Sequence, residues 1–271
     1  MSNPLTIATR EEYNKYAALN CSAAKPLLVS PAHYKHYMTA EREETKALRM
    51  GSLTHALVLE PEAVRSRFAF LPEGIDRRTS AGKLAYSAFE AAAMGKTIVN
   101  ADEANDCRAF AAALEKTIKE VLKVTFTATE LMLAVDYCGA RLKSAIDAVG
   151  SDGFLYDLKT AESADPKKWL YSAKDYRFPL QAHFYRTVYQ AATGERVKGF
   201  RFIVVEKSPP YCVAIYEFGP ELMTYAAMDF EKAVSDYKTY TGLDEWPGYP
   251  TEVQILDINS PAHASVPIQF A

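Results

Sequence analysis

Three strand-like segments, separated by two turns that contain glycine, follow one another over residues 131–160. Residues 140–149 alternate between two sets of side chains, and this period of two predicts a β-strand. The apolar residues 131–137 come before this segment, and residues 154–160 follow it. Strands joined by turns this short pair antiparallel, because parallel neighbours need a long crossover. The segment therefore predicts a sheet at the centre of the fold.

The first turn also predicts how its two strands pair. A two-residue loop at residues 138–139 is the commonest hairpin for this sequence, and it pairs Tyr137 with Ala140. Counting back along both strands from that pair places Glu130 opposite Asp147.

The second turn predicts the next pairing. A three-residue loop over residues 151–153, with its glycine in the left-handed conformation, pairs Gly150 with Phe154. Asp147 then lies opposite Asp157. A four-residue loop would instead turn Asp147 to the other face of the sheet, so the prediction depends on the loop.

These registers place Glu130, Asp147 and Asp157 side by side on one face, with Lys159 two residues further along that face. Neighbouring carboxylates repel one another and destabilise a sheet unless a cation lies among them. Their oxygens favour Mg²⁺ or Mn²⁺ over zinc, and a lysine beside such an ion can assist attack on a phosphate. The alternative is a solvated sheet face with scattered acids and no ion.

The rest of the chain is expected to be rich in helix. We predict an α/β fold with a central mixed β-sheet flanked by helices and a helical N-terminal elaboration. A single domain would span residues 1–271, with a mainly helical part over 1–124, an α/β core over 125–250 and a C-terminal tail over 251–271. Helices are expected over residues 31–37, 50–59, 80–93, 101–122, 179–192 and 221–241 and from Pro166, with strands over 197–206 and 211–218.

The composition is that of a globular protein, with 49% hydrophobic residues, 24% charged residues and a net charge of −3. This charge argues against a surface that attracts nucleic acid everywhere, but it permits a local basic groove. No run approaches the ~18 apolar residues of a membrane span, and the N-terminus lacks the pattern of a signal peptide. We therefore expect a cytoplasmic protein with no membrane partner.

Several motifs resemble those of a nuclease superfamily. Asp147, followed by DLK over residues 157–159, resembles the Asp…(Asp/Glu)-x-Lys pattern of the PD-(D/E)xK nucleases. Gln181 and Tyr185 resemble the Gln-x-x-x-Tyr helix motif of the RecB-like branch. Six motifs follow in the order seen in exodeoxyribonuclease VIII (RecE-type) nucleases: residues 30–34 (SPAHY), 51–61 (GSLTHALVLEP), 77–83 (RRTSAGK), 157–160 (DLKT), 181–185 (QAHFY) and 245–247 (EWP).

The resemblance implies a specific activity. A nuclease of this kind is a Mg²⁺-dependent 5′-to-3′ exonuclease on linear double-stranded DNA, and Mn²⁺ is expected to substitute for Mg²⁺. It leaves 3′ single-stranded tails for annealing-type recombination. The implied partners are double-stranded DNA ends, a single-strand annealing protein and further copies of the chain in a ring-shaped homo-oligomer.

The resemblance also implies roles for particular residues. Lys159 would be the catalytic lysine, and Gln181 and Tyr185 would position the DNA end or the scissile phosphate. The implied metal-site residues are His55, Glu130, Asp147, Asp157 and the carbonyl group of Leu158. The chain departs from the family at the middle acid, where it has SAID over residues 144–147 instead of a variant of Arg-Pro-Asp.

Two basic clusters are candidate DNA-binding surfaces. The first consists of Arg77, Arg78 and Lys83, and the second includes Lys174 and Arg177 with aromatic residues between the cations. Cations bind phosphates, and aromatic rings beside them can stack on the bases of a single strand. A solvated surface without a ligand is the alternative for both clusters.

Three other functions remain open. A site-specific or structure-specific endonuclease could use the same fold, and a catalytically idle DNA-binding scaffold could recruit an annealing protein. A Cas4-like nuclease with an iron–sulfur cluster needs four cysteines, but Cys21, Cys107, Cys138 and Cys212 lack the short spacing of cluster ligands. The same spacing gives no sign of a zinc ribbon or a redox pair.

Overall fold

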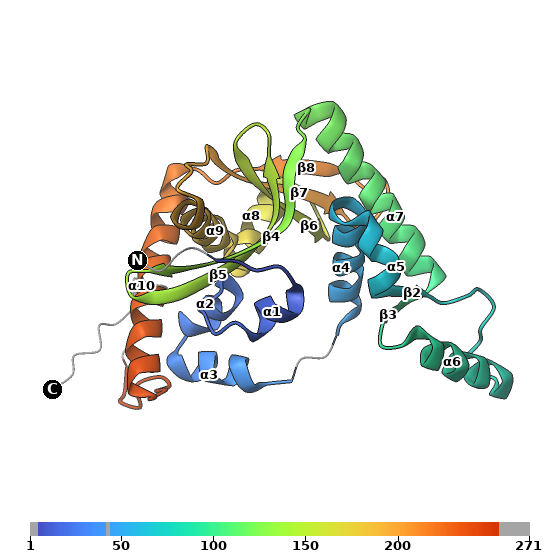
Figure 1. The fold of residues 1–271 in the computed structure, drawn as a ribbon, viewed down its shortest axis with the longest axis horizontal. Coiled ribbons are helices and arrows are strands. Elements are labelled where there is room, and N and C mark those ends of the chain that lie inside the picture. Colours follow the sequence, from blue (N-terminus) through green and yellow to red (C-terminus); the bar gives the residue numbers. More distant parts are fainter. Residues whose placement is uncertain (1–4, 42–43, 255–271) are drawn as a thin grey trace.

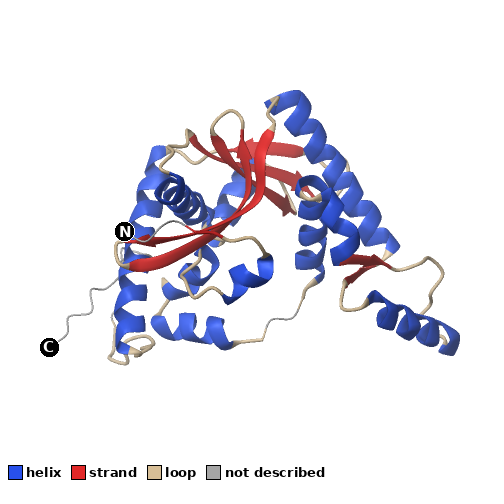
Figure 2. Cartoon of the chain, in the orientation of Figure 1, coloured by secondary structure: helices blue, strands red, loops and turns tan. Residues whose placement is uncertain are grey.

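The computed structural model describes residues 5–41 and 44–254 and is built around a mixed six-stranded sheet (Figures 1 and 2). The strands lie in the order β1-β4-β5-β6-β7-β8, and neighbours are antiparallel except β6 and β7. Their bounds are β1 Leu5–Thr6, β4 Phe126–Tyr137, β5 Ala140–Gly150, β6 Phe154–Ala161, β7 Gly199–Glu206 and β8 Val213–Tyr216. The predicted α/β fold with a central mixed sheet is therefore confirmed.

Both predicted hairpin registers are confirmed. Tyr137 pairs with Ala140 across the first turn, and the pairs on either side of Glu130 keep the same register. Across the second turn, Ala148 pairs with Tyr156 in the register that a three-residue loop requires. The second ladder ends at that pair, immediately before Asp147 and Asp157 would meet.

The connection between the parallel strands β6 and β7 consists of two helices. Helix α8 (Pro166–Asp175) begins as predicted, with the Asp165 side chain accepting hydrogen bonds from two backbone amides of the first turn. Helix α9 (Phe178–Thr193) ends at Gly194, whose left-handed conformation suits glycine. Helix α10 (Pro220–Leu243) follows β8 and packs beside α9.

The N-terminal part is mainly helical, as predicted, but it also contains short elements that the sequence pattern did not indicate. The predicted helices correspond to α3 (Pro31–Thr39), α4 (Lys46–Leu59), α6 (Ser80–Ala93) and α7 (Ala101–Lys116). The additional elements are β1, α1 (Arg10–Lys15), α2 (Cys21–Leu27), α5 (Val64–Arg67), β2 (Phe68–Phe70) and β3 (Thr97–Val99). The last two form a separate parallel pair.

The long helix predicted over residues 101–122 is partly wrong. The α-helical hydrogen-bond pattern ends at Lys116, and Thr117–Leu122 is π-helical. Six residues are too few for apolar periodicity to distinguish a π-helix from an α-helix, which differ in their hydrogen-bond pattern. The predicted tail over 251–271 lies almost wholly outside the described residues, which end at 254.

Each face of the sheet carries its own apolar core. One core contains residues of α2, α9 and α10, and the other contains residues of α4 and α7. Successive residues of β6 alternate between them, since Leu155 belongs to the first core and Tyr156 and Leu158 belong to the second. Helices therefore cover both faces (Figure 1). None of the helices in the described ranges has the length and apolar character needed to cross a membrane.

Candidate active site

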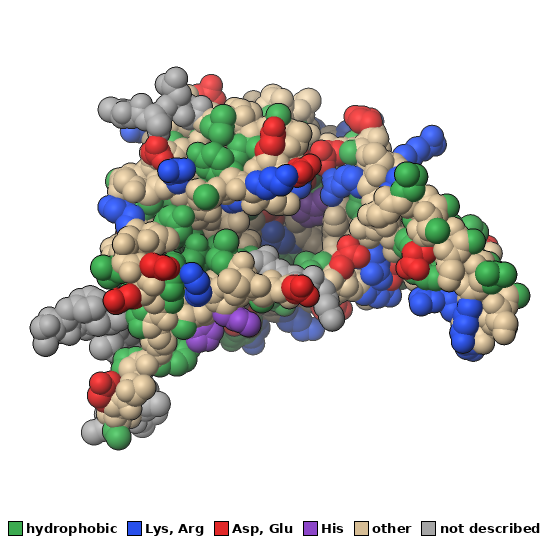
Figure 3. Space-filling view, turned by 60° about the horizontal axis from the view of Figure 1, so that its bottom comes forward, with side chains coloured by type: hydrophobic (Ala, Val, Ile, Leu, Met, Phe, Trp, Pro, Cys, Tyr) green, Lys and Arg blue, Asp and Glu red, His purple; other side chains and the backbone are tan. Residues whose placement is uncertain are grey.

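A cleft of about 630 Å³ opens over the middle of the sheet. Helices α1 and α2 lie on one side of it and α4 lies on the other (Figure 1). Figure 3 shows this face hollowed at its centre, with basic and histidine side chains inside the hollow. The floor is formed by residues of β4, β5 and β6, and Tyr185 reaches it from α9.

The predicted acidic residues lie where strands β5 and β6 separate. The carboxylate of Asp147 accepts a hydrogen bond from the backbone N–H of Leu158 at 2.8 Å. The Asp147 side chain thus replaces the next backbone hydrogen bond between β5 and β6. The separation opens the sheet at Asp147, so that groups from both of its faces can reach the same point.

Three potential metal ligands meet at this opening. Ligand atoms of His55, Glu130 and Asp147 all lie within 4.8 Å of one another. His55 comes from α4, while Glu130 and Asp147 come from adjacent positions on β4 and β5. The backbone of Glu130 has φ +48°, which is uncommon for a residue other than glycine. Strain of this kind is often found at functional sites.

Hydrogen bonding fixes the tautomer of His55. Its Nε2 lies 2.8 Å from the carbonyl oxygen of Leu158, and a carbonyl oxygen can only accept, so Nε2 carries the proton. The other ring nitrogen, Nδ1, lies 3.4 Å from the Asp147 carboxylate. A ligating histidine is typically held in this way by a hydrogen bond from its second nitrogen. The Leu158 carbonyl, predicted as a ligand, uses one lone pair to hold the ring.

The electrostatics of the cluster favour a bound cation. Burial, together with the nearby charge of Asp157, raises the pKa of Asp147 to about 8. Burial and the charge of Asp147 also raise the pKa of Glu130, while burial lowers the pKa of His55 and favours its neutral form. A divalent ion would offset this repulsion, and a neutral imidazole with carboxylates is a suitable ligand set.

Asp157 lies beside this cluster and contacts two of the other predicted residues. Its Oδ1 accepts a hydrogen bond from Gln181 Nε2 at 2.5 Å, and its Oδ2 forms an ion pair with Lys159. The same Oδ2 is buried and has no hydrogen bond of acceptable geometry. An incompletely satisfied buried carboxylate is a second sign that the site fits a cation.

The surroundings of Lys159 restrain its side chain. Its Nζ lies 4.9 Å from the centre of the Phe178 ring, a distance suited to a cation–π interaction. Tyr185 lines the same cleft, and burial raises the pKa of its hydroxyl group well above 10. Tyr185 therefore stays protonated and can donate a hydrogen bond. The structure thus brings together all eight residues predicted for catalysis or metal binding.

Two basic residues near this site are not predicted from the sequence. Arg10, on α1, donates a hydrogen bond to the carboxylate of Glu130 and lines the cleft. Lys25, on α2, lies 5.4 Å from the Phe178 ring, and burial lowers its pKa. Neither belongs to a motif, and each reaches the site only through tertiary packing. No local signal could have identified them.

The predicted DNA-binding residues lie outside the cleft. Arg78 is paired with Asp76, and Arg77 stacks on Tyr86 at 4.0 Å, both near the start of α6. Figure 1 shows α6 standing away from the sheet. Lys83 and Lys174 are exposed, and Arg177 binds Asp229 at 2.8 Å. Their roles in DNA binding stay predictions.

Comparison with known families agrees with this geometry. Residues 20–259 match the model of the family DUF3799, described as a "PDDEXK-like domain of unknown function". The chain belongs to this family. Membership places the chain in the PD-(D/E)xK superfamily, as predicted, and the matched range covers all eight residues predicted for catalysis or metal binding. The narrower RecE-type affiliation stays a prediction.

Solved structures provide a second comparison. A protein from Eubacterium rectale named "Putative exonuclease" is 14% identical, with a TM-score of 0.60, and the match covers 89% of this chain and 90% of the other. At that identity the likeness shows the fold alone. An alkaline exonuclease from Laribacter hongkongensis is 12% identical, and the match covers 62% of this chain and 86% of the other. Its TM-score of 0.33 is too low to indicate a shared fold. No curated protein matches the chain in sequence.

Proposed function

We propose that the protein is a Mg²⁺-dependent exonuclease that degrades one strand of linear double-stranded DNA from its 5′ end. The observation that carries the proposal is the convergence of His55, Glu130 and Asp147 beside the Asp157–Lys159 pair in one cleft of a PD-(D/E)xK fold. Acidic and histidine ligands beside a lysine suit hydrolysis of a phosphodiester.

His55, Glu130, Asp147 and Asp157 would hold the ion. When bound, Mg²⁺ supplies charge neutralisation for the phosphate and a water of lowered pKa, and Mn²⁺ can serve in the same way. Lys159 directs its ammonium group toward the Asp157 carboxylate and stabilises negative charge that develops nearby. Gln181 fixes one oxygen of Asp157, and protonated Tyr185 donates a hydrogen bond to a phosphate oxygen.

The polarity and the partners rest on the resemblance of six ordered motifs to the RecE-type nucleases. On that basis, the 3′ single-stranded tails would pass to a single-strand annealing protein in recombination, and several copies of the chain would form a ring around the DNA. The word "exonuclease" in the name of the Eubacterium rectale protein supports the same reading. An open cleft of this size can accept a DNA strand.

The test is digestion of linear duplex DNA labelled at either the 5′ or the 3′ end, beside a covalently closed circle. Each reaction is run with Mg²⁺, with Mn²⁺ and with EDTA. We expect early release of the 5′ label alone, from linear DNA alone, and only when a metal ion is present.

Each of the other outcomes would indicate a different activity. Cleavage of the circle would identify an endonuclease on the same fold. Early release of the 3′ label would reverse the polarity. Absence of cleavage with either ion, while duplex DNA still binds, would favour the idle scaffold.

A further inference from the structure

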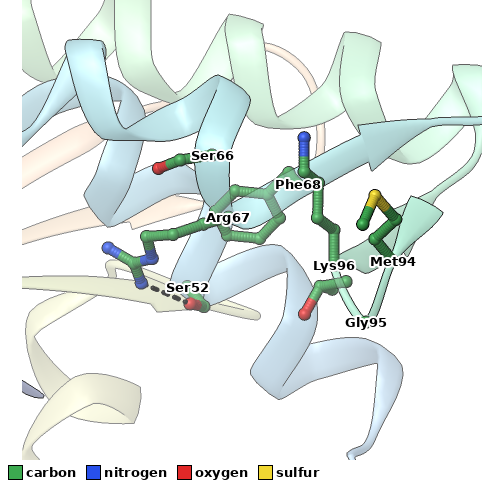
Figure 4. Close-up of a pocket in the computed structure, with 8 residues that line it drawn as sticks. Ser52, Ser66, Arg67, Phe68, Met94, Gly95 and Lys96 are labelled. Atoms are coloured by element: carbon green, nitrogen blue, oxygen red, sulfur yellow. Dashed lines mark hydrogen bonds between the residues drawn. The ribbon is translucent and has the colours of Figure 1, made fainter. Parts of the chain in front are cut away.

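A second concavity adjoins the cleft. This trough, of about 370 Å³, is open to solvent and lies between α4, the segment from α5 to β2, and the turn that joins α6 to β3. Its lining residues are Ser52, Ser66, Arg67, Phe68, Met94, Gly95, Lys96 and Thr97 (Figure 4). Among the described residues that line it, none is acidic, in contrast with the cleft.

Two cations lie at separate points of the trough. Arg67 extends toward Ser52, and its guanidinium donates a hydrogen bond to the serine oxygen at 3.2 Å (Figure 4). Lys96 is drawn on the other side of the Phe68 ring, and its Nζ donates to the carbonyl oxygen of Arg65 at 2.9 Å. An ammonium group has three donors, so one contact to a carbonyl leaves capacity for an anion.

Two acidic residues beside the trough accept hydrogen bonds from residues that line it, but do not line it themselves. Glu60 binds the other end of the Arg67 guanidinium at 2.7 Å, which fixes the direction of that side chain. Glu44 accepts a weak hydrogen bond from Thr97 at 3.3 Å. The inner surface therefore presents the Lys96 ammonium, the Arg67 guanidinium that Glu60 partly neutralises, and hydroxyl groups. Cations beside hydroxyl groups can bind phosphate oxygens.

The trough borders on the cleft. Ser52 and Arg67 line both concavities. Ser52 also precedes His55 by three residues on α4, so the two side chains lie on the same helix face, with Cβ atoms about 5–6 Å apart. A strand whose scissile phosphate lay at the metal cluster could therefore extend along α4 into the trough.

The shape favours an extended ligand over a small one. A site for a free nucleotide usually encloses most of its ligand, whereas this trough is largely open to solvent. The exposed side chain of Met94 stands at its rim and offers an adaptable apolar contact for a sugar or a base. Gly95, which follows in the turn, has no neighbouring atom within 4 Å of where a Cβ would lie.

We propose that this trough binds the backbone of the DNA strand that occupies the active site, with Arg67 on a phosphate near the metal cluster and Lys96 on a phosphate further along. The inference rests on the proposed nuclease function and extends it, because it assigns a substrate-binding track that lies outside the catalytic cleft. Sequence-independent contacts of this kind position a strand without reading its bases.

The test measures the salt dependence of DNA affinity. Full-length protein is titrated against a fluorescent 20-base-pair duplex, with Ca²⁺ in place of Mg²⁺, at several salt concentrations. Loss of one phosphate contact lowers the slope of log affinity against log salt concentration by about 1. We expect that loss for Arg67→Gln and for Lys96→Gln, and a loss of about 2 for the double variant. Arg67→Lys, which keeps the charge, should retain most of the slope.

The matched control is Lys119→Gln, which removes one charge from an exposed position outside the trough. Its slope should equal that of the wild type. A slope that stays unchanged in the double variant, while the wild type still cleaves DNA, would overturn the trough and leave the proposed function intact. Absence of DNA cleavage and binding by the wild type would instead remove the proposed function.

A small substrate separates strand binding from product binding. Thymidine 5′-p-nitrophenyl phosphate carries a single phosphodiester, so with that group at the metal cluster it has no second phosphate for Lys96. Its KM should therefore not change in Lys96→Gln. Competition by thymidine 5′-monophosphate should be equally strong in wild type and variant. If the variant lost affinity for the mononucleotide but not for the duplex, the trough would be a product site and the proposal would be wrong.

Discussion

Asp147 lies at the point where the sheet opens, and its buried environment predicts how the stability of the protein depends on pH. Its pKa is raised to about 8, chiefly by burial, whereas the unfolded chain titrates near 3.9. Between these values the folded protein holds a proton that the unfolded chain has lost. This carboxyl group therefore lowers the stability of the metal-free protein as pH rises above about 4, and the penalty is complete above about 8.

The same group predicts how Mg²⁺ acts. An ion binds the ionised carboxylate, so below pH 8 binding must release the proton. We expect the rise in melting temperature caused by Mg²⁺ to increase from pH 6 to pH 8 and to level off above that. Thermal unfolding with Mg²⁺ or EDTA at four pH values measures it. Asp147→Asn should weaken the pH trend, and a wild-type shift that is independent of pH would contradict the assignment.

Lys159 is the residue whose loss should separate binding from chemistry. Because its ammonium group lies against Asp157, Lys159→Ala removes charge stabilisation at the site. We expect kcat for DNA cleavage to fall by about 10²–10³-fold while the Kd for duplex DNA changes only a few-fold. Lys119→Ala, at an exposed position, is the control. Normal cleavage by Lys159→Ala would refute the catalytic role.

At the scale of elements, the pairing of strands joined by a short turn can be predicted from the sequence, whereas the pairing of short strands far apart in the chain cannot. The hairpin registers follow from turns of two and three residues, so the meeting of Glu130 with Asp147 could be predicted. Strand β1 and the β2–β3 pair are two or three residues long and join segments far apart in the chain. Such short strands carry too little periodicity to be recognised.

Lys143 joins the central sheet to helix α1. It lies on the predicted strand, but its buried Nζ donates to the carbonyl oxygens of Tyr13 and Tyr16, at 2.6 and 2.8 Å. These carbonyls lie at the end of α1, so the lysine holds that helix against the sheet. Arg10, on the same helix, is thereby kept beside Glu130.

We therefore expect Lys143→Met to lower the free energy of unfolding by about 2 kcal/mol, since hydrogen bonds from a charged donor are lost. Urea denaturation monitored by circular dichroism measures the change. The control is Lys15→Met, whose exposed ion pair with Glu11 should contribute less than about 0.5 kcal/mol. Equal stability of the two variants would show that Lys143 does not secure α1.

At the scale of the whole molecule, the two apolar cores explain why the site draws on distant segments. His55 arrives from the helix layer on one face and Gln181 from the layer on the other, and they meet where β5 and β6 part. The residues that catalyse are therefore fixed by both layers at once. The sequence order of the motifs could suggest this meeting, but only the packing of both layers determines its geometry.

Residues of the first and the last of the six motifs contact each other outside the cleft and stabilise the fold. Tyr34, from the first motif, stacks on Trp246, from the last, with ring centres 5.1 Å apart. Lys35 lies 5.0 Å from the indole ring, and the Ala32 amide donates to the carbonyl oxygen of Pro247 at 3.0 Å. This contact joins α3 to the end of α10 and so links segments more than 200 residues apart.

The contact of Tyr34 with Trp246, here called the clasp between α3 and α10, should contribute to stability and not to catalysis, because neither residue lines the cleft. Trp246→Ala removes the stacked ring, so we expect the free energy of unfolding to fall by about 1–2 kcal/mol. Trp246→Phe keeps an aromatic ring and loses the Nε1 hydrogen bond to Asp244, so it should lose less. Urea denaturation and steady-state cleavage are measured on both. A large fall in kcat at unchanged stability would mean that this motif acts at the active site, and the division between clasp and cleft would have to be abandoned.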